Sequence, residues 1–253
     1  TGLISADSHI IEPPGCYTDH IEPKYRDVAP RIVRHADGFD TYYVRDMPKT
    51  ASVGLLGAAG LRDQAMQDFI AGATFDQIPR GSWNPADRLL AQDRDGIAGE
   101  LIYASLGMVL CSHPDYDYMN ACFQAYNRWL QGFCDAAPDR LFGLAQTAVT
   151  SVEAAIEDFK RGKEMGFVGM MMPGSPQHED YDHPDYDPLW ACAEDLDLPI
   201  CFHILTARTG DLATAMTAQR GHPLNAFLGI MRSIQDIIGL FVLGGIFERF
   251  PKL

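Results

Sequence analysis

The chain has 253 residues, a usual length for a single large α/β barrel domain and long enough to bury a sizeable hydrophobic core. Hydrophobic residues make up 47% and charged residues 21%, and the mean hydropathy of -0.11 is typical of a soluble globular protein. A formal net charge of -14 disfavours nucleic acid and anionic membrane surfaces, because both would repel the protein. We therefore expect one domain over residues 1–253, with neither nucleic acid nor a membrane as its partner.

The cysteines and the most apolar stretch both indicate a protein of the cytoplasm. The six cysteines are scattered, form no C-x-x-C pair and follow no signal-peptide pattern at Thr1, so reduced thiols are expected. The apolar stretch 224–246 is interrupted by Arg232, Gln235 and Asp236, and it falls short of the roughly 20 apolar residues of a membrane span. It is predicted to be a buried or interface helix.

The first predicted element is a strand that leads into polar residues. The apolar run 3–6 is predicted to be a buried strand, and it ends at the sequence D-S-H over residues 7–9. Pro13 and Pro14 then force the backbone out of regular structure. The polar residues therefore lie where a strand meets its loop.

A segment of different character follows. Residues 31–35 and 41–45 flank Ala-Asp-Gly at 36–38, a pattern typical of a β-hairpin. The sequence after the hairpin is rich in glycine and alanine. We interpret residues 24–83 as a segment inserted after the first strand, which serves as a lid beside the barrel.

From Asn84 onwards helices and strands alternate. Asn84 followed by Pro85 is typical of a helix start. The later elements are expected as strands near Leu101, Phe142, Val168 and Pro199, and as helices over 118–136, 152–165 and 188–196. Such units predict a parallel sheet, and we assign the fold class as an α/β TIM (β/α)8 barrel. A closed barrel needs eight strands, so we expect one that is truncated after about five strand-helix units.

The sequence H-P-D-Y-D occurs twice, at 113–117 and 183–187, each time between a strand and a helix. Aspartate is a preferred N-cap residue, so we attribute both copies to capping by an aspartate. A catalytic role for these acids is the alternative.

Three residues are candidates for a metal site. Side chains two positions apart on a strand point to the same side, so Asp7 and His9 could share one cation at the barrel mouth. His203 follows the apolar strand 199–202 and is the candidate third ligand. Carboxylate oxygen and imidazole nitrogen both suit Zn²⁺, and three protein ligands plus water make an open catalytic site. The alternative is that each residue is a hydrogen-bonded structural residue.

Several motifs along the chain match one known family. They are I-S-A-D-S-H-I-I-E-P-P at 4–14, W-N-P-A-D-R-L at 83–89, A-Y-N-R-W-L at 125–130, A-P-D-R-L at 137–141, Y-D-P-L-W at 186–190 and F-E-R-F-P-K-L at 247–253. Together they resemble the amidohydrolase-related enzymes, in the branch that contains aminocarboxymuconate-semialdehyde decarboxylase and other aromatic-acid decarboxylases.

The resemblance implies a divalent metal, Zn²⁺ in the first place with Mn²⁺ as the alternative, and a homo-oligomer. It implies that Asp7, in place of the more usual histidine or glutamate, acts with His9 as the first-strand pair, and that His203 is the fifth-strand ligand. The acid-base residue and the strand-eight aspartate of the family are expected beyond Leu253, so no catalytic residue is assigned. The implied reaction is hydrolysis by a metal-activated water, or non-oxidative decarboxylation of a carboxylate-bearing or cyclic substrate.

Further candidates surround the expected metal site. Glu12 is a candidate to support the first-strand ligands, with a surface turn residue as the alternative. Arg208 could bind a substrate carboxylate bidentately. Trp83, together with Arg62 and Arg80, is a candidate to contact substrate from the lid, although exposed arginines are usually only solvated.

Two other functions stay open at this stage. The expected loss of three strands is also consistent with a catalytically inactive, truncated barrel. The apolar stretch 224–246 is also consistent with a metal-free binding or assembly module.

Overall fold

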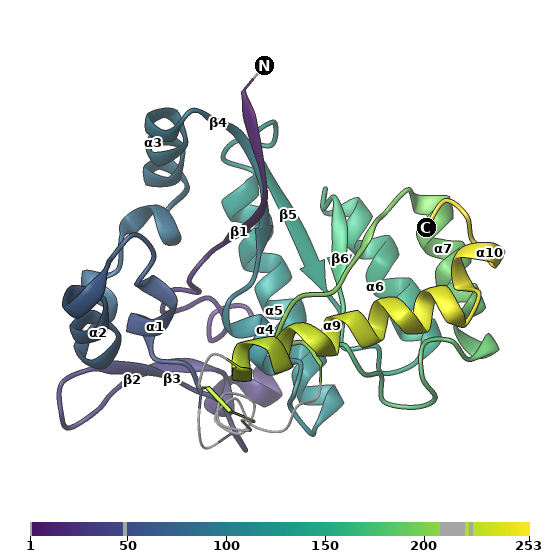
Figure 1. Ribbon diagram of the computed structural model, residues 1–253, viewed down its shortest axis with the longest axis horizontal. Helices are drawn as coiled ribbons and strands as arrows, with labels where there is room; N and C mark the ends of the chain where they lie inside the picture. Colours follow the sequence, from purple (N-terminus) through teal and green to yellow (C-terminus); the bar gives the residue numbers. More distant parts are fainter. Residues whose placement is uncertain (1, 48–49, 208–220, 223–224) are drawn as a thin grey trace.

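Figure 1 shows the computed structural model, which describes residues 2–47, 50–207, 221–222 and 225–253. Its centre is a five-stranded sheet in the order β1-β4-β5-β6-β7, and all neighbouring strands are parallel. The strands are β1 Leu3–His9, β4 Ile97–Tyr103, β5 Leu141–Gln146, β6 Gly169–Met171 and β7 Ile200–Cys201. Successive strands lie side by side in chain order, as repeated strand-helix-strand units produce. The predicted α/β fold with a parallel sheet is confirmed.

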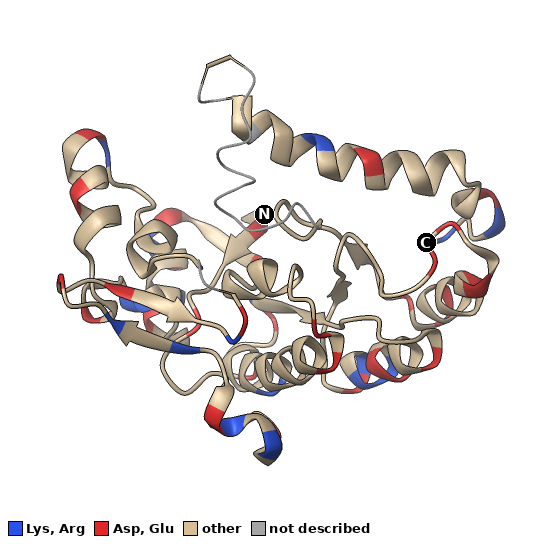
Figure 2. Cartoon of the chain, turned by 90° about the horizontal axis from the view of Figure 1, so that it is seen from below, with Lys and Arg blue, Asp and Glu red and all other residues tan. Residues whose placement is uncertain are grey.

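Helices lie on both sides of this sheet. They are α3 Pro85–Asp95, α4 Leu106–Leu110, α5 Tyr116–Cys134, α6 Val152–Glu164, α7 Asp187–Leu196, α9 Asn225–Leu243 and α10 Ile246–Arg249, with the 3-10 turn η4 Pro184–Tyr186 before α7. Figures 1 and 2 show α5, α6 and α7 on one side of the sheet and α9 on the other. Helices α5, α6 and α7 supply several of the largest fully buried side chains of the core, which are Trp190, Tyr118, Tyr126, Phe123 and Phe159.

Polar side chains fix where several helices begin. Asn84 and Asp115 accept hydrogen bonds from backbone amides in the first turns of α3 and α5, at 3.1 and 3.0 Å. Both caps agree with the sequence prediction. The second H-P-D-Y-D copy differs, because His183 rather than Asp185 caps the turn there, with its Nδ1 accepting from the Asp185 amide at 3.4 Å. The cap lies two positions earlier in this copy because η4 begins at Pro184, directly after His183.

Strand β1 is an edge strand, which corrects the prediction of a buried strand at 3–6. In the described residues its one strand partner is β4. Leu3 and Ile4 are 67% and 59% exposed. The apolar composition predicts burial, but the place of β1 in the sheet, and not its composition, sets the exposure here.

Residues between β1 and α3 form a small hairpin-containing unit, whose buried residues join the core of the rest of the chain. Strands β2 Arg31–Arg34 and β3 Asp40–Tyr43 pair antiparallel, so the predicted hairpin is confirmed. The unit also contains η1 Pro23–Val28, α1 Val53–Gly57, α2 Asp63–Gly72, η2 Phe75–Gln77 and η3 Arg80–Ser82. Its role as a lid stays a prediction.

The apolar stretch near the C-terminus forms α9. Ile230, Ile237 and Phe241 are buried, whereas Leu228 and Ile238 are more than half exposed. The helix is therefore buried along one side only. Within the part of the chain that the structure describes, no helix is both long and apolar enough to cross a membrane. All six cysteines are free thiols, as predicted.

Candidate metal centre

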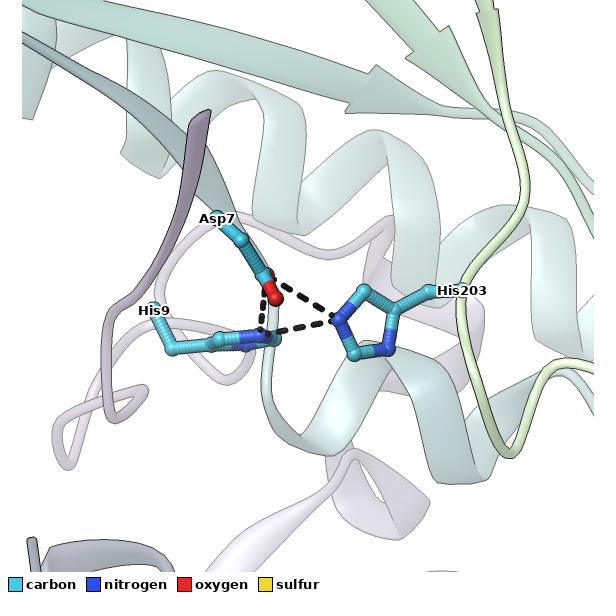
Figure 3. A group of neighbouring side chains, drawn as sticks. All are labelled: Asp7, His9 and His203. Atoms are coloured by element: carbon cyan, nitrogen blue, oxygen red, sulfur yellow. Dashed lines mark hydrogen bonds and ion pairs between the residues drawn. The ribbon is translucent and has the colours of Figure 1, made fainter. Parts of the chain in front are cut away.

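Asp7, His9 and His203 converge on one point, as Figure 3 shows. The Nε2 atoms of the two histidines are 3.1 Å apart. The Oδ1 atom of Asp7 lies 3.3 Å from Nε2 of His9 and 3.2 Å from Nε2 of His203. The three donor atoms thus form a nearly equilateral triangle.

The two edges of the sheet supply these ligands. Asp7 and His9 come from β1, and His203 lies two residues after β7, so the sheet must curl to bring its edge strands together. The β1 strand carries an irregularity in its pairing with β4 between Ser5 and Ser8. Such bulges redirect side chains and are common beside active sites. Asp7 lies within this irregular stretch of β1.

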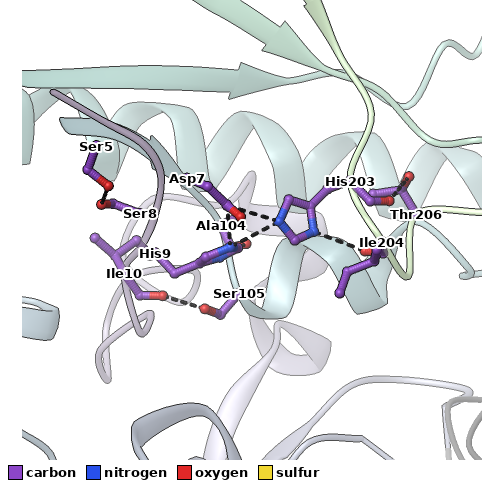
Figure 4. A network of polar contacts seen from close by, with 10 residues as sticks. All are labelled: Ser5, Asp7, Ser8, His9, Ile10, Ala104, Ser105, His203, Ile204 and Thr206. Atoms are coloured by element: carbon purple, nitrogen blue, oxygen red, sulfur yellow. Dashed lines mark hydrogen bonds and ion pairs between the residues drawn. The ribbon is translucent and has the colours of Figure 1, made fainter. Parts of the chain in front are cut away.

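Backbone carbonyls orient both imidazoles (Figure 4). The Nδ1 atom of His9 is 3.1 Å from the carbonyl oxygen of Ala104, and the Nδ1 atom of His203 is 3.1 Å from that of Ile204. A carbonyl only accepts, so each Nδ1 carries the proton and each Nε2 presents a lone pair. Metal-binding histidines are commonly oriented in this way.

This arrangement fits a divalent cation. Two lone pairs and a carboxylate oxygen face each other without a proton between the two imidazole nitrogens, and a cation at the centre would satisfy all three. Ligands about 2.0–2.1 Å from tetrahedral Zn²⁺ lie about 3.3 Å apart, and those of an octahedral ion at about 2.1 Å lie about 3.0 Å apart. The observed separations of 3.1–3.3 Å agree with either geometry.

The surroundings keep His9 in its neutral, ligating form. Burial lowers the pKa of His9 and the nearby His203 lowers it further, while Asp7 opposes both effects. Tyr103, at the end of β4, places its ring centroid 5.7 Å from that of His9 and 5.1 Å from that of His203. Tyr103 is not among the residues predicted from the sequence, although its position at the end of a predicted strand is a signal that could have identified it. Burial, with Cys201 beside the phenol, raises the pKa of Tyr103.

Glu12 is an interior residue and not a surface turn residue. Its side chain is fully buried, with 0% exposure. The carboxylate accepts hydrogen bonds from the backbone amides of Ser105, Leu106 and Gly107 at 3.1, 3.0 and 3.2 Å. Burial raises the pKa of Glu12, and these backbone donors oppose that rise by stabilising the charge. It therefore packs against the end of the loop after β4 and the first turn of α4.

A cavity of about 1040 Å³ opens beside the cluster, with His9 and His203 in its wall. Arg80 and Arg88 also line it, each in an ion pair with an acidic residue of the same wall, Asp87 and Glu100. Trp83 does not share this wall. It lines a second cavity of about 300 Å³ with Arg128 and other residues of α5, so its contact with substrate stays a prediction.

The other arginine candidates are not brought to the cluster. Arg208 lies outside the described residues, and its role stays a prediction. Arg62 precedes α2 as its N-terminal flanking residue in the hairpin-containing unit. Arg80 stacks on Trp83, with its guanidinium carbon 5.2 Å from the ring centroid, and pairs with Asp87 at 2.7 Å.

Comparison with known proteins places these features in a family. The chain is 28% identical over 192 residues to the decarboxylase orsB of Emericella nidulans, an alignment that covers 72% of this chain and 57% of that protein. It is 36% identical over 80 residues to a gamma-resorcylate decarboxylase of Rhodococcus jostii, covering 28% of this chain and 24% of the relative. The chain therefore spans little more than half of its curated relatives at most.

Solved structures share the fold over the whole chain. An amidohydrolase from Mycobacterium avium subsp. paratuberculosis superposes with a TM-score of 0.74 at 19% identity, covering 100% of this chain and 71% of that one. A dihydroxybenzoic acid decarboxylase from Polaromonas, with bound manganese and the inhibitor 2-nitroresorcinol, gives a TM-score of 0.60 at 18% identity, covering 100% and 64%. At these identities the likeness concerns the fold, which fits a TIM-barrel-like arrangement.

A family model described as Amidohydrolase matches residues 114–253. This region holds β5 to β7 and His203. It is more than half of the 253 residues. Together with the decarboxylase relatives, the match shows that this chain belongs to the amidohydrolase family of enzymes.

Proposed function

We propose that the chain carries the metal centre of a non-oxidative decarboxylase that acts on a small aromatic carboxylate. The convergence of the donor atoms of Asp7, His9 and His203 within 3.1–3.3 Å of one another carries the proposal. The curated relatives supply the reaction, since orsB and the gamma-resorcylate enzymes are named decarboxylases. Because a solved relative holds manganese, Mn²⁺ stands beside Zn²⁺ as the proposed cation.

Each residue has a definable part in this proposal. When bound, the cation would act as a Lewis acid that holds the substrate's oxygen atoms and stabilises developing negative charge. His9 and His203 would hold it through Nε2, because their Nδ1 protons are donated to Ala104 and Ile204. Asp7 supplies one negative charge and is 68% exposed, so the centre is open to a ligand from solvent.

The cavity beside the centre is large enough for the proposed substrate. Its volume of about 1040 Å³ lies at the upper end of the range for small-molecule sites. Decarboxylation breaks the bond between the ring and the carboxylate carbon, releases CO₂ and leaves a proton to be added to the ring carbon. None of the described residues is assigned as the donor of that proton.

Hydrolysis by a metal-activated water is a second candidate, because the matching family model is described as Amidohydrolase. It would use the same three ligands. The two reactions differ in their products, since only decarboxylation releases CO₂. A product assay therefore separates them.

The test is CO₂ release from 2,6-dihydroxybenzoate by the purified chain, supplied with Mn²⁺ or Zn²⁺. We expect metal-dependent release that is abolished in His203→Ala. His183→Ala is the matched control, because His183 is a partly exposed histidine of the η4 turn, away from the cluster. Metal binding without CO₂ release from this acid or related hydroxybenzoates would contradict the decarboxylase assignment, and failure to bind metal would contradict the centre itself.

A further inference from the structure

Glu12 joins two segments that carry parts of the candidate metal centre. It lies three residues beyond His9, where the chain leaves β1. Its carboxylate accepts from three consecutive backbone amides, those of residues 105–107, at 3.0–3.2 Å. Tyr17 donates a further, longer hydrogen bond to the carboxylate at 3.4 Å. A buried negative charge is thus surrounded by donors.

The loop that Glu12 holds is the one that orients His9. Residue 104, directly before the three amides, offers the carbonyl oxygen that accepts the Nδ1 proton of His9 at 3.1 Å. A second hydrogen bond links the same two segments with donor and acceptor exchanged, because the Ser105 hydroxyl donates to the Ile10 carbonyl at 2.6 Å. The peptide plane between Ala104 and Ser105 is therefore fixed on both sides.

A carboxylate is the side chain that this position requires. Its two oxygens accept all three amide hydrogen bonds, whereas a glutamine would turn an NH₂ group towards some of the same donors. Burying a charge opposes folding, and an interior is often as stable with apolar residues in its place. The retained charge is therefore better explained by the geometry it imposes on the loop than by a gain in stability.

We propose that Glu12 is a positioning residue of the metal centre, which holds the Ala104 carbonyl where it fixes His9 as the Nδ1-protonated tautomer and directs its Nε2 lone pair at the cation. This inference rests on the proposed metal centre of Asp7, His9 and His203. It assigns Glu12 a part in metal affinity without contact with the metal.

His203 provides an internal control. Its Nδ1 proton goes to the carbonyl of its own neighbour, Ile204, and not to the loop that Glu12 holds. Loss of Glu12 should therefore release the tautomer of His9 and leave that of His203 in place. A general loss of structure would disturb both.

The experiment compares Glu12→Gln with the parent chain by long-range ¹H–¹⁵N correlation of the histidine rings and by titration with Mn²⁺ and with Zn²⁺. We expect His9 in Glu12→Gln to populate both tautomers, His203 to stay Nδ1-protonated, and metal affinity to fall about 10- to 100-fold, as is usual when the support of a metal ligand is removed.

Asp158→Asn is the matched control. Asp158 is another buried carboxylate, 8% exposed, and it accepts hydrogen bonds from Gln124 at 2.9 Å and Thr147 at 2.8 Å. Both variants should lose stability, but Asp158→Asn should keep the parent's metal affinity. If Glu12→Gln does not fold, Ser105→Ala takes its place. This variant removes only the hydrogen bond from the Ser105 hydroxyl to the Ile10 carbonyl, and it should also weaken metal binding.

The outcomes separate this inference from the proposed function. If the parent binds metal no better than His203→Ala, the metal centre itself is wrong. If the parent binds metal but Glu12→Gln, or Ser105→Ala in its place, keeps both the parent's affinity and the parent's His9 tautomer, the positioning role is wrong. An equal loss of affinity in Asp158→Asn would also overturn it, because the effect would then be one of stability alone.

Discussion

The Nε2 atoms of His9 and His203 lie 3.1 Å apart although 194 positions separate the two residues in the chain. Each imidazole donates its Nδ1 proton to a backbone carbonyl, so two lone pairs are directed towards one point. Two neutral imidazoles in this arrangement gain nothing from each other. We therefore interpret the two imidazoles as two of the three ligands of the proposed cation site.

Adding Mn²⁺ or Zn²⁺ should stabilise the parent chain against unfolding. A ligand that binds only the folded state adds about 2.7 kcal/mol at a concentration 100 times its Kd. We expect the Tm of the parent to rise with metal concentration and the Tm of Asp7→Ala to rise much less, because one ligand and the site's only carboxylate among the described donors are gone. Differential scanning calorimetry measures this. Equal shifts in both proteins would argue against Asp7 as a ligand.

Gly107→Ala should damage the candidate metal centre through the first turn of α4, which follows β4. A Cβ atom at residue 107 would lie 2.1 Å from Oε1 of Gln146 and 2.6 Å from Cβ of Ala104, so this segment must move. We expect a loss of about 1–3 kcal/mol in stability together with weaker metal binding.

Gly54→Ala is the control for that variant, since its Cβ would lie 2.2 Å from the backbone oxygen of Phe69 in α2. It should lower stability by a similar amount and leave metal affinity unchanged. Denaturant unfolding and metal titration of both variants check the pair. Weaker metal binding in Gly54→Ala as well would mean that any loss of stability lowers affinity.

Asp40 should make the hairpin unit sensitive to acid. Arg34 donates hydrogen bonds to the Asp40 carboxylate, and the Phe75 amide donates another at 2.8 Å. These donors hold the pKa of Asp40 below its usual value, although burial alone would raise it. The folded state therefore binds fewer protons than the unfolded state, so this stabilisation is complete above the usual pKa of aspartate and is lost as the pH falls through the lowered value. Asp40→Asn should cost about 2 kcal/mol at pH 7 and less in acid.

Urea unfolding of the parent and of Asp40→Asn at pH 7 and at successively lower pH measures this difference. Asp95→Asn is a suitable comparison, because Asp95 forms an exposed ion pair with Arg94 and is not expected to change stability appreciably. A stability difference for Asp40→Asn that does not shrink towards low pH would contradict the predicted role of its charge.

The exposed edge of β1 should promote self-association. Leu3 and Ile4 are largely exposed on a strand whose described pairing is with β4 alone, and such edges recruit further strands. We expect Ile4→Lys to reduce concentration-dependent association in sedimentation velocity. Leu90→Lys is the control, because Leu90 is 68% exposed on helix α3. An equal effect of both variants would point to general hydrophobicity instead of the strand edge.

Much of the fold could be predicted because the elements concerned depend on residues that are close together in the sequence. The alternation of strands and helices after residue 84, the caps at Asn84 and Asp115, and the hairpin at 31–43 all depend on neighbouring residues. The candidate ligands Asp7 and His9 could be paired by the alternation of a strand. His203 could be proposed from its place at the end of an apolar strand, but only the folded sheet shows that it meets them.

The remaining features depend on contacts between distant segments. Burial of Glu12 depends on amides more than ninety residues away, so its sequence neighbours could not decide between a residue that supports the ligands and a surface turn residue. Trp83 is a candidate for substrate contact because it lies in the segment interpreted as a lid, yet it lines another cavity. Exposure of β1 also depends on which strands flank it, which composition does not reveal.

The ligands come from the two edge strands of one curled sheet, and this has a topological consequence. A cation held jointly by Asp7 and His203, which are 196 positions apart, would close a loop through almost the whole chain, much as a long-range disulfide does. The first and last strands of the sheet would then open together or not at all. Removal of metal should therefore convert one cooperative unfolding transition into separate fraying at both edges, which hydrogen exchange at β1 and β7 can resolve.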